Sequence, residues 1–134
     1  MNTELYFEET AETEVLVNRE KKQLLIVRKG AGYIALPLMQ IAMFVTENKI
    51  VFAITRDGQK YMTDKNLTEL EAVLDDHLFF RANRKFIINA FYIKGFQALD
   101  RVKLLIDMSV KPANNVIVVS QLTAPAFKKW MHAH

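Results

Sequence analysis

The stretch "IAMFVTENKIVFAITRDGQKYMT" (residues 41–63) holds three short runs rich in Val, Ile, Phe and Tyr, at 41–46, 49–55 and 60–63. Turn signals separate the runs. Glu47-Asn48-Lys49 suits a tight connection, and Asp57-Gly58 is a strong hairpin signal because glycine accepts a positive φ. Runs of this length and composition are typical of antiparallel hairpins.

Runs of similar composition lie on both sides of this stretch. Further β-rich runs lie at 23–28, 33–36, 79–82, 86–88, 96–99, 102–108 and 116–120. Gly30 and Gly32 supply turn chemistry after the first of them, and Asp100-Arg101 suits another tight connection. Strands in series predict a mainly β fold of small antiparallel sheets, and they argue against a parallel βαβ sheet.

Two helices are expected among these strands. In the first, at about 66–76, Asn66 is the N-cap and Glu69 completes a capping box, while one face is apolar: Leu67, Leu70, Val73 and Leu74. The second is short and lies at the C-terminus. There Thr123 is the expected cap, Pro125 suits the first turn, and the apolar side consists of Phe127, Trp130 and Met131.

Composition predicts one compact domain, since 134 residues with 51% hydrophobic and 25% charged side chains can bury a substantial core. We assign residues 1–22 to an acidic lead-in or linker and residues 23–134 to the domain. Five glutamates and no Lys or Arg lie in residues 1–14, so residues 15–134 carry 18 basic against 10 acidic side chains, a net charge of +8. Such a domain attracts polyanions, although plain surface solvation is the alternative explanation.

Several classes of function are disfavoured by what the chain lacks. It has no cysteine, which excludes disulfides and thiolate sites and fits a reducing cytoplasm. Its apolar stretches fall short of the roughly 18 residues that a membrane span needs, and no signal-peptide pattern opens it. The only histidines are His77, His132 and His134, which offer little for a metal or catalytic site. We therefore expect a cytoplasmic protein that is not an enzyme, with no cofactor, metal or membrane partner.

The stretch "FFRANRKFIIN" (79–89) places cations inside an apolar run. Its apolar residues form continuous blocks and do not alternate, which predicts burial on both faces with Asn83-Arg84-Lys85 as a polar island between them. Buried flanks hold a loop rigidly, so less entropy is lost when the loop meets a ligand. Arg can bond guanine, Asn can bond adenine and Lys can contact phosphate, yet these side chains could also be merely solvated.

These stretches together carry a family resemblance. From "QIAMFVTENKIVFAITRDGQKYMTDKNLTELEAVLD" (40–75) through "FFRANRKFIIN" (79–89) and "YIKGF" (92–96) to "VVSQLTAPAFKKWM" (118–131), order and spacing are kept. The chain resembles the LytTR family of bacterial DNA-binding domains, most closely the version in response regulators of Bacteroidetes type. That resemblance implies about ten strands in three small antiparallel sheets, and loops that enter successive major grooves of double-stranded DNA.

Residue roles follow from the same resemblance. The first loop would be Glu47-Asn48-Lys49, the second Asn83-Arg84-Lys85, and the third would begin at Ser120. The implied DNA contacts are Asn48, Lys49, Asn83, Arg84, Lys85, Gln121, Thr123, Lys128 and Lys129. Gln121 and Thr123 stand where the family often has basic residues, which weakens the electrostatic contribution. Arg81 is either a structural arginine beneath the second loop or a phosphate contact.

The resulting hypothesis is a sequence-specific, double-stranded DNA-binding domain of a transcription regulator in a two-component system. A homodimer on repeated half-sites is implied, and so is a receiver domain or sensor kinase partner if the chain is an excised output domain. The alternative is a protein-interaction module of LytTR-like fold that has lost DNA reading, as Gln121 and Thr123 would allow. A small-ligand pocket has only the aromatic content behind it.

Overall fold

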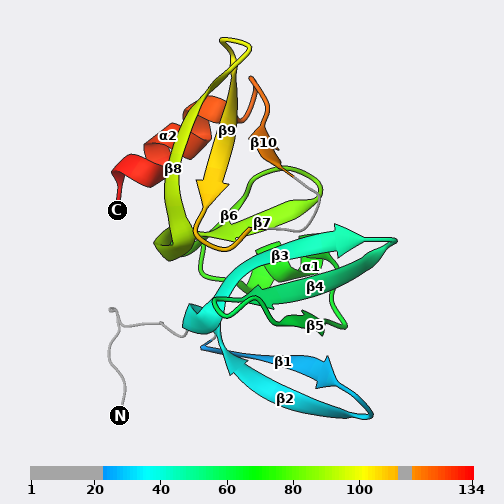
Figure 1. The fold of residues 1–134 in the computed structure, drawn as a ribbon. Helices are drawn as coiled ribbons and strands as arrows, with labels where there is room; N and C mark the ends of the chain where they lie inside the picture. The colour runs from blue at the N-terminus through cyan, green and yellow to red at the C-terminus, as the bar shows by residue number, and fades with distance from the viewer. Residues whose placement is uncertain (1–22, 112–115) are drawn as a thin grey trace.

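The computed structural model describes residues 23–111 and 116–134 (Figure 1), so the proposed acidic lead-in, residues 1–22, lies outside the described residues. Within that part of the chain, ten strands and two α-helices follow one another, with two short 3₁₀ turns, η1 (Leu38–Gln40) and η2 (Ala90–Tyr92). The ten strands confirm the mainly β fold. None of the helices in the described part of the chain is long and apolar enough to cross a membrane.

The strands form two antiparallel sheets. The larger has the order β2-β1-β5-β4-β3-β7-β6. Its strands are β1 (Leu24–Lys29), β2 (Gly32–Pro37), β3 (Ile41–Glu47), β4 (Ile50–Thr55), β5 (Lys60–Met62), β6 (Phe79–Arg81) and β7 (Phe86–Asn89). The smaller has the order β10-β9-β8 and consists of β8 (Ile93–Leu99), β9 (Lys103–Met108) and β10 (Ile117–Val119). Each run predicted from sequence overlaps one of these strands, and five strands extend beyond their runs.

The prediction of three sheets is wrong, because the β1–β2 hairpin joins the larger sheet. Only one residue pair makes this joint, Arg28 of β1 with Met62 of β5. The Arg28 guanidinium reinforces it through an ion pair with Asp64, at 2.8 Å between Nε and Oδ1. By contrast, β3 and β4 pair along their whole length apart from one irregularity near Ile41.

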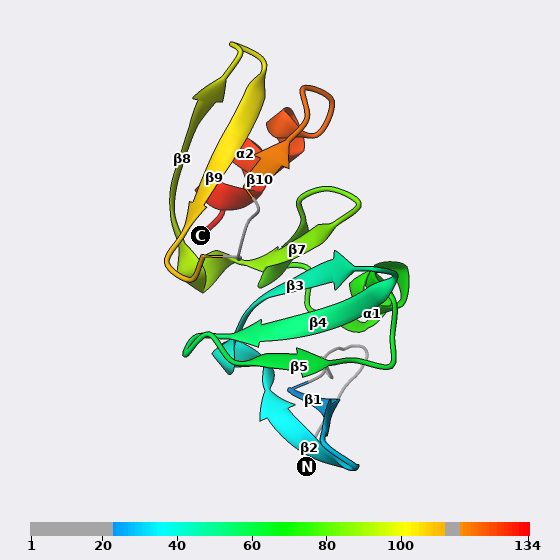
Figure 2. The same cartoon turned by 45° about the vertical axis from the view of Figure 1, so that its right-hand side comes forward.

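Two hydrophobic cores lie on opposite faces of the larger sheet (Figures 1 and 2). In the first, α1 (Leu67–Val73) packs on the sheet, and the core includes Leu25, Val27, Phe44, Leu67, Leu70, Phe79 and Ile87. In the second, the smaller sheet and α2 (Ala124–His132) pack on the other face, and the core includes Val45, Phe86, Ile88, Leu104, Ile106, Val119 and Phe127. Strand β7 therefore contributes to both cores, which confirms the burial on both faces expected from its unbroken apolar run.

The first helix is shorter than predicted. Its capping box is confirmed, because Asn66 Oδ1 accepts from the Glu69 N–H at 2.8 Å and Glu69 Oε1 accepts from the Asn66 N–H at 2.9 Å. The helix ends at Val73 because Leu74, which is only 5% exposed, turns to an extended ψ of 152° to enter the first core. Val73 was expected on the apolar face, but its side chain is 40% exposed.

The second helix begins differently from the prediction. Thr123 makes no side-chain capping bond, so its expected capping role is wrong. The Ser120 carbonyl instead accepts from the backbone N–H groups of Thr123 and Ala124, at 3.1 and 2.9 Å, and a turn leads into the helix. Phe127 is fully buried in the second core, and Trp130 and Met131 pack on that core partly exposed, as the apolar side predicts.

Asn89 ends β7 as a fully buried polar residue. Its Nδ2 donates to the Ile41 carbonyl at 2.8 Å, and its Oδ1 accepts from the Phe91 N–H at 2.9 Å. One side chain thus ties the end of β7 to the start of β3 and begins the η2 turn that leads into the smaller sheet.

We expect Asn89→Ala to lower the free energy of unfolding by about 1–3 kcal/mol, because it leaves the buried Ile41 carbonyl without that donor. Urea unfolding followed by circular dichroism measures the change. Gln97→Ala, at an exposed position of β8, is the control and should stay within about 0.5 kcal/mol of the wild type. Equal losses in the two variants would contradict the role given to Asn89.

Candidate nucleic-acid interface

The loop between β6 and β7, residues 82–85, is braced from within by Asn83. Its Oδ1 accepts from the backbone N–H groups of Lys85 and Phe86, at 2.8 and 3.0 Å. Its Nδ2 donates to the Val118 carbonyl of β10 at 2.9 Å. Because both polar atoms of the amide are occupied, the geometry favours a positioning role for Asn83 over the base contact expected from the sequence.

Arg81 reinforces the same loop from beneath. Its Nε donates to the Asn83 carbonyl at 2.7 Å and its Nη2 to the Arg84 carbonyl at 3.3 Å, while Nη1 lies 3.1 Å from Glu71 Oε1. The Arg81 side chain is only 23% exposed. Of the two roles left open for this residue, the geometry favours the structural one.

Arg84 is exposed, unlike Arg81 and Asn83, which hold the loop and are partly buried. Ala82 at the start of the loop and Phe86 just after it are each 1% exposed, whereas Arg84 and Lys85 between them are exposed. Among the described residues, the Arg84 guanidinium forms no hydrogen bond or ion pair. A charged fork on a rigid, internally bonded loop can donate two parallel hydrogen bonds to a planar acceptor pair.

Two hydrogen bonds join this loop to the segments on either side of it. On one side, the Thr46 N–H at the end of β3 donates to the Lys85 carbonyl at 3.0 Å. On the other, the Asn83 amide reaches the Val118 carbonyl shortly before Ser120. Figure 2 shows the β3–β4 turn, the β6–β7 loop and the β10–α2 segment projecting toward the same side of the molecule. We call residues 47–49, 82–85 and 120–123 the loop edge.

The fold and the loop edge can be set beside known proteins. A family model described as the LytTR DNA-binding domain matches residues 31–132. The chain belongs to this family. A solved structure of the LytTR DNA-binding domain of a methyl-accepting/DNA response regulator from Bacillus cereus has the same fold, with a TM-score of 0.70 and 23% identity over 82% of this chain and 97% of that one. A search of curated proteins finds no match.

At one end of its loop edge, the LytTR domain presents a two-residue turn. Asn48 and Lys49 have φ values of 50° and 69°, the positive values that a type I′ turn requires at both central positions. Both residues are exposed, and their side chains have no hydrogen-bond or ion-pair partner within residues 23–111 and 116–134. Glu47 beside them is compensated, because its Oε1 lies 2.6 Å from Lys60 Nζ. The turn therefore adds positive charge to the edge.

At the other end, the third segment carries little charge. Gln121 is exposed, and Thr123 is half-buried with its hydroxyl 3.3 Å from that of Ser120. Between them, Leu122 is 91% exposed, a position that the sequence reasoning did not single out. An apolar residue flanked by polar ones within a loop was the signal that could have drawn attention to it.

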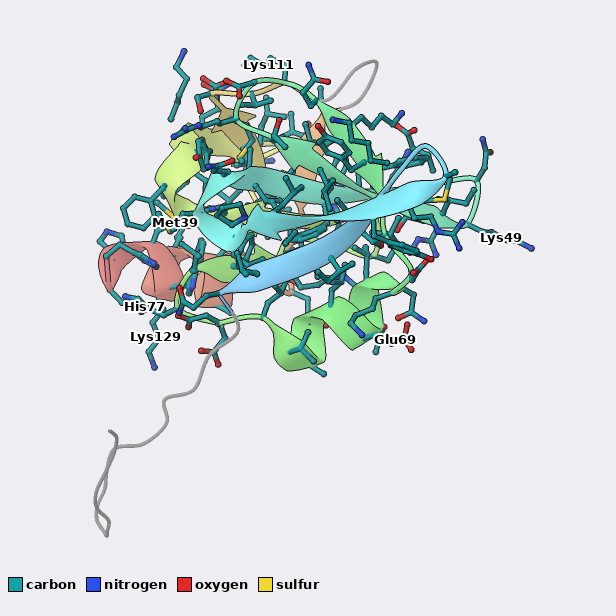
Figure 3. The ribbon with its side chains drawn as sticks, turned by 90° about the horizontal axis from the view of Figure 1, so that it is seen from below. Met39, Lys49, Glu69, His77, Lys111 and Lys129 are labelled. Atoms are coloured by element: carbon teal, nitrogen blue, oxygen red, sulfur yellow. The ribbon has the colours of Figure 1, made fainter. Side chains whose placement is uncertain are left out.

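The two lysines of α2 lie outside the loop edge, in the helix that follows its third segment. Both Lys128 and Lys129 are exposed, but Figure 3 places Lys129 near His77, at the opposite end of the molecule from Lys49. The reason is that α2 begins at the loop edge and runs away from it, so Lys129 in the last turn lies about 8 Å further along the helix axis than Ala124. The phosphate contact expected of Lys129 is therefore not favoured by its position.

A cleft beside Lys49, lined by three cations and two carboxylates, was also not predicted from the sequence. Arg28 and Lys65 line it together with Lys49. Its two acidic residues are engaged, Asp64 with Arg28 and Glu69 in the capping box of α1. Lys65 thus adds a positive charge next to the first loop, and no sequence signal indicated that position.

We expect Asn83→Ala to loosen the β6–β7 loop and to lower the free energy of unfolding by about 1–3 kcal/mol, since two backbone N–H groups and one carbonyl lose their partner. Amide hydrogen exchange at Lys85 and Phe86 measures the local effect and should become faster. Arg84→Ala is the matched control, because the Arg84 side chain holds nothing within the described structure, and it should leave both amides unchanged. Unchanged exchange in Asn83→Ala would contradict the brace.

Proposed function

We propose that this LytTR domain is a sequence-specific, double-stranded DNA-binding domain of a cytoplasmic transcription regulator, which presents its loop edge to the major groove. The observation that supports this most is the pair of hydrogen bonds Thr46–Lys85 and Asn83–Val118, because they join three segments distant in sequence into one edge. The carboxylate within that edge, Glu47, is paired with Lys60, and Glu71 beside the edge is paired with Arg81, which leaves a cationic surface for a polyanion.

In this proposal the residues of the edge divide their roles. Arg84 donates two hydrogen bonds to O6 and N7 of guanine, the commonest specific contact of this side chain. Asn48 or Lys49 reads a second base, Gln121 is a secondary reader, and Lys85 contacts phosphate. Asn83 and Arg81 hold the loop in place, so Arg84 loses less conformational freedom on binding than it would on a mobile loop. The role of each residue is open to direct test by substitution.

We expect Arg84→Ala to weaken binding to the preferred site by about 1–3 kcal/mol and to relax the preference at one base pair. Lys85→Gln should weaken binding to all sequences alike, because phosphate carries no sequence information. Selection from random duplexes defines the site, and gel retardation on that site and on a scrambled duplex measures the two effects. Equal losses on both duplexes for Arg84→Ala would refute base reading by Arg84.

We expect Lys49→Gln to reduce the slope of log K against log salt by about 0.9, the contribution of one neutralised phosphate or an equivalent counterion release. Lys129→Gln removes the same charge at the far end of the molecule and should leave the slope unchanged. Fluorescence anisotropy at several salt concentrations gives both slopes. Equal slopes for the two variants would contradict the claim that the loop edge, and not the far end of the molecule, contacts the phosphates.

Pairing on DNA belongs to the same proposal. Two copies would occupy repeated half-sites, and a receiver domain would supply the signal, as in response regulators. Sedimentation of the purified chain with duplexes carrying one or two copies of the selected half-site measures the stoichiometry. Tight self-association without retardation of any duplex would instead favour a protein-interaction module.

A further inference from the structure

Leu122 is the most exposed large hydrophobic residue of the described chain, at 91%, ahead of Phe91 and Val116 at 70% each. Single exposed apolar residues are ordinary on protein surfaces, so exposure alone means little. The place of Leu122 is what distinguishes it. It lies on the loop edge, between Gln121 and Thr123, in the segment that follows β10.

The backbone around Leu122 is held on both sides. Val119 before it and Ala124 after it are 0% and 6% exposed, and both belong to the second core. The Ser120 carbonyl accepts from the N–H groups of Thr123 and Ala124, which closes the turn across Leu122. The turn therefore holds the backbone of Leu122 in place, with its side chain exposed and outside the core.

We propose that Leu122 contacts the C5-methyl group of a thymine in the major groove and makes the domain prefer an A·T pair at that position. This inference rests on the proposed function. The thymine methyl is the apolar group that base edges display in the major groove, and apolar side chains are its natural partners. Gln121, exposed next to Leu122, can bond N6 and N7 of adenine. The two adjacent side chains therefore suit the two bases of A·T pairs, Gln121 the adenine and Leu122 the thymine.

The surroundings of Leu122 argue against a protein partner at this point. Ser120, Gln121 and Thr123 around it are polar, and the loop edge also carries Arg84 and Lys49. Protein-binding patches are contiguous apolar areas of several hundred Å², which a lone leucine does not provide. A single methyl-sized apolar target within a polar, anionic groove matches this surface better.

The test replaces each thymine of the selected site, one at a time, by deoxyuridine, which removes only the C5-methyl group. With the full 134-residue chain, we expect one or two positions at which affinity falls about fourfold, the effect of burying one methyl-sized group. Leu122→Ala should bind the unmodified site about fourfold more weakly and should no longer respond to deoxyuridine at those positions. Fluorescence anisotropy gives both affinities.

Phe91→Ala is the matched control, because Phe91 is also a highly exposed apolar residue but lies on η2, on the side away from the β3–β4 turn (Figure 1). It should keep wild-type affinity and wild-type sensitivity to deoxyuridine. If no thymine is sensitive, or if sensitivity survives in Leu122→Ala while Arg84→Ala still relaxes the site, the methyl contact is overturned and DNA reading stands. Absence of any enriched site or retardation would overturn both proposals.

Discussion

Burial of β7 on both faces is the constraint on which the rest of the structure depends. Its Ile87 side chain enters the core under α1, while Phe86 and Ile88 enter the core under the smaller sheet and α2. A four-residue strand in this position cannot shift its register without moving residues out of both cores. The loop that precedes it inherits that rigidity, and so do the two segments bonded to the loop.

At the loop edge, some residues hold the β6–β7 loop in place and others present their side chains to solvent. Asn83 and Arg81 are the polar residues whose chemistry first suggests a ligand, yet their donors and acceptors are used on backbone groups of the same loop and of β10. Arg84 directly follows Asn83 in the sequence and keeps its guanidinium exposed. This arrangement is how a loop without a helix or strand of its own can offer a charged group at a defined place.

Much of the fold could be predicted because it depends on local signals. The alternating and continuous apolar runs locate the strands, and the Asn48-Lys49 and Asp57-Gly58 turns fix which neighbours pair. The number of sheets could not be predicted, since it depends on the one pair between Arg28 and Met62, residues 34 positions apart. No run of residues encodes a single long-range bridge of that kind.

For the candidate site, the sequence pointed to the exposed polar island but not to the contacts that its residues make. The polar island at 83–85 was visible because apolar blocks flank it, but the partner of the Asn83 amide is Val118, 35 residues away. The start of α2 was placed correctly, yet Thr123 at the N-cap position makes no side-chain capping bond, and the Ser120 carbonyl accepts from the N–H groups of Thr123 and Ala124. Lys129 was chosen for its charge, and only the direction of α2 shows that it lies far from Lys49 (Figure 3).

The pairing of β1 with β5 at a single position, Arg28 with Met62, affects how the β1–β2 hairpin is held. The β1–β2 hairpin is held to the domain chiefly by Leu25, Val27 and Leu36 in the first core, and hardly at all by a ladder of hydrogen bonds. Hydrophobic contact is non-directional, whereas a ladder resists rotation. The orientation of the hairpin relative to β5 therefore depends on how its side chains pack in the first core, and not on a continuous run of paired backbone groups.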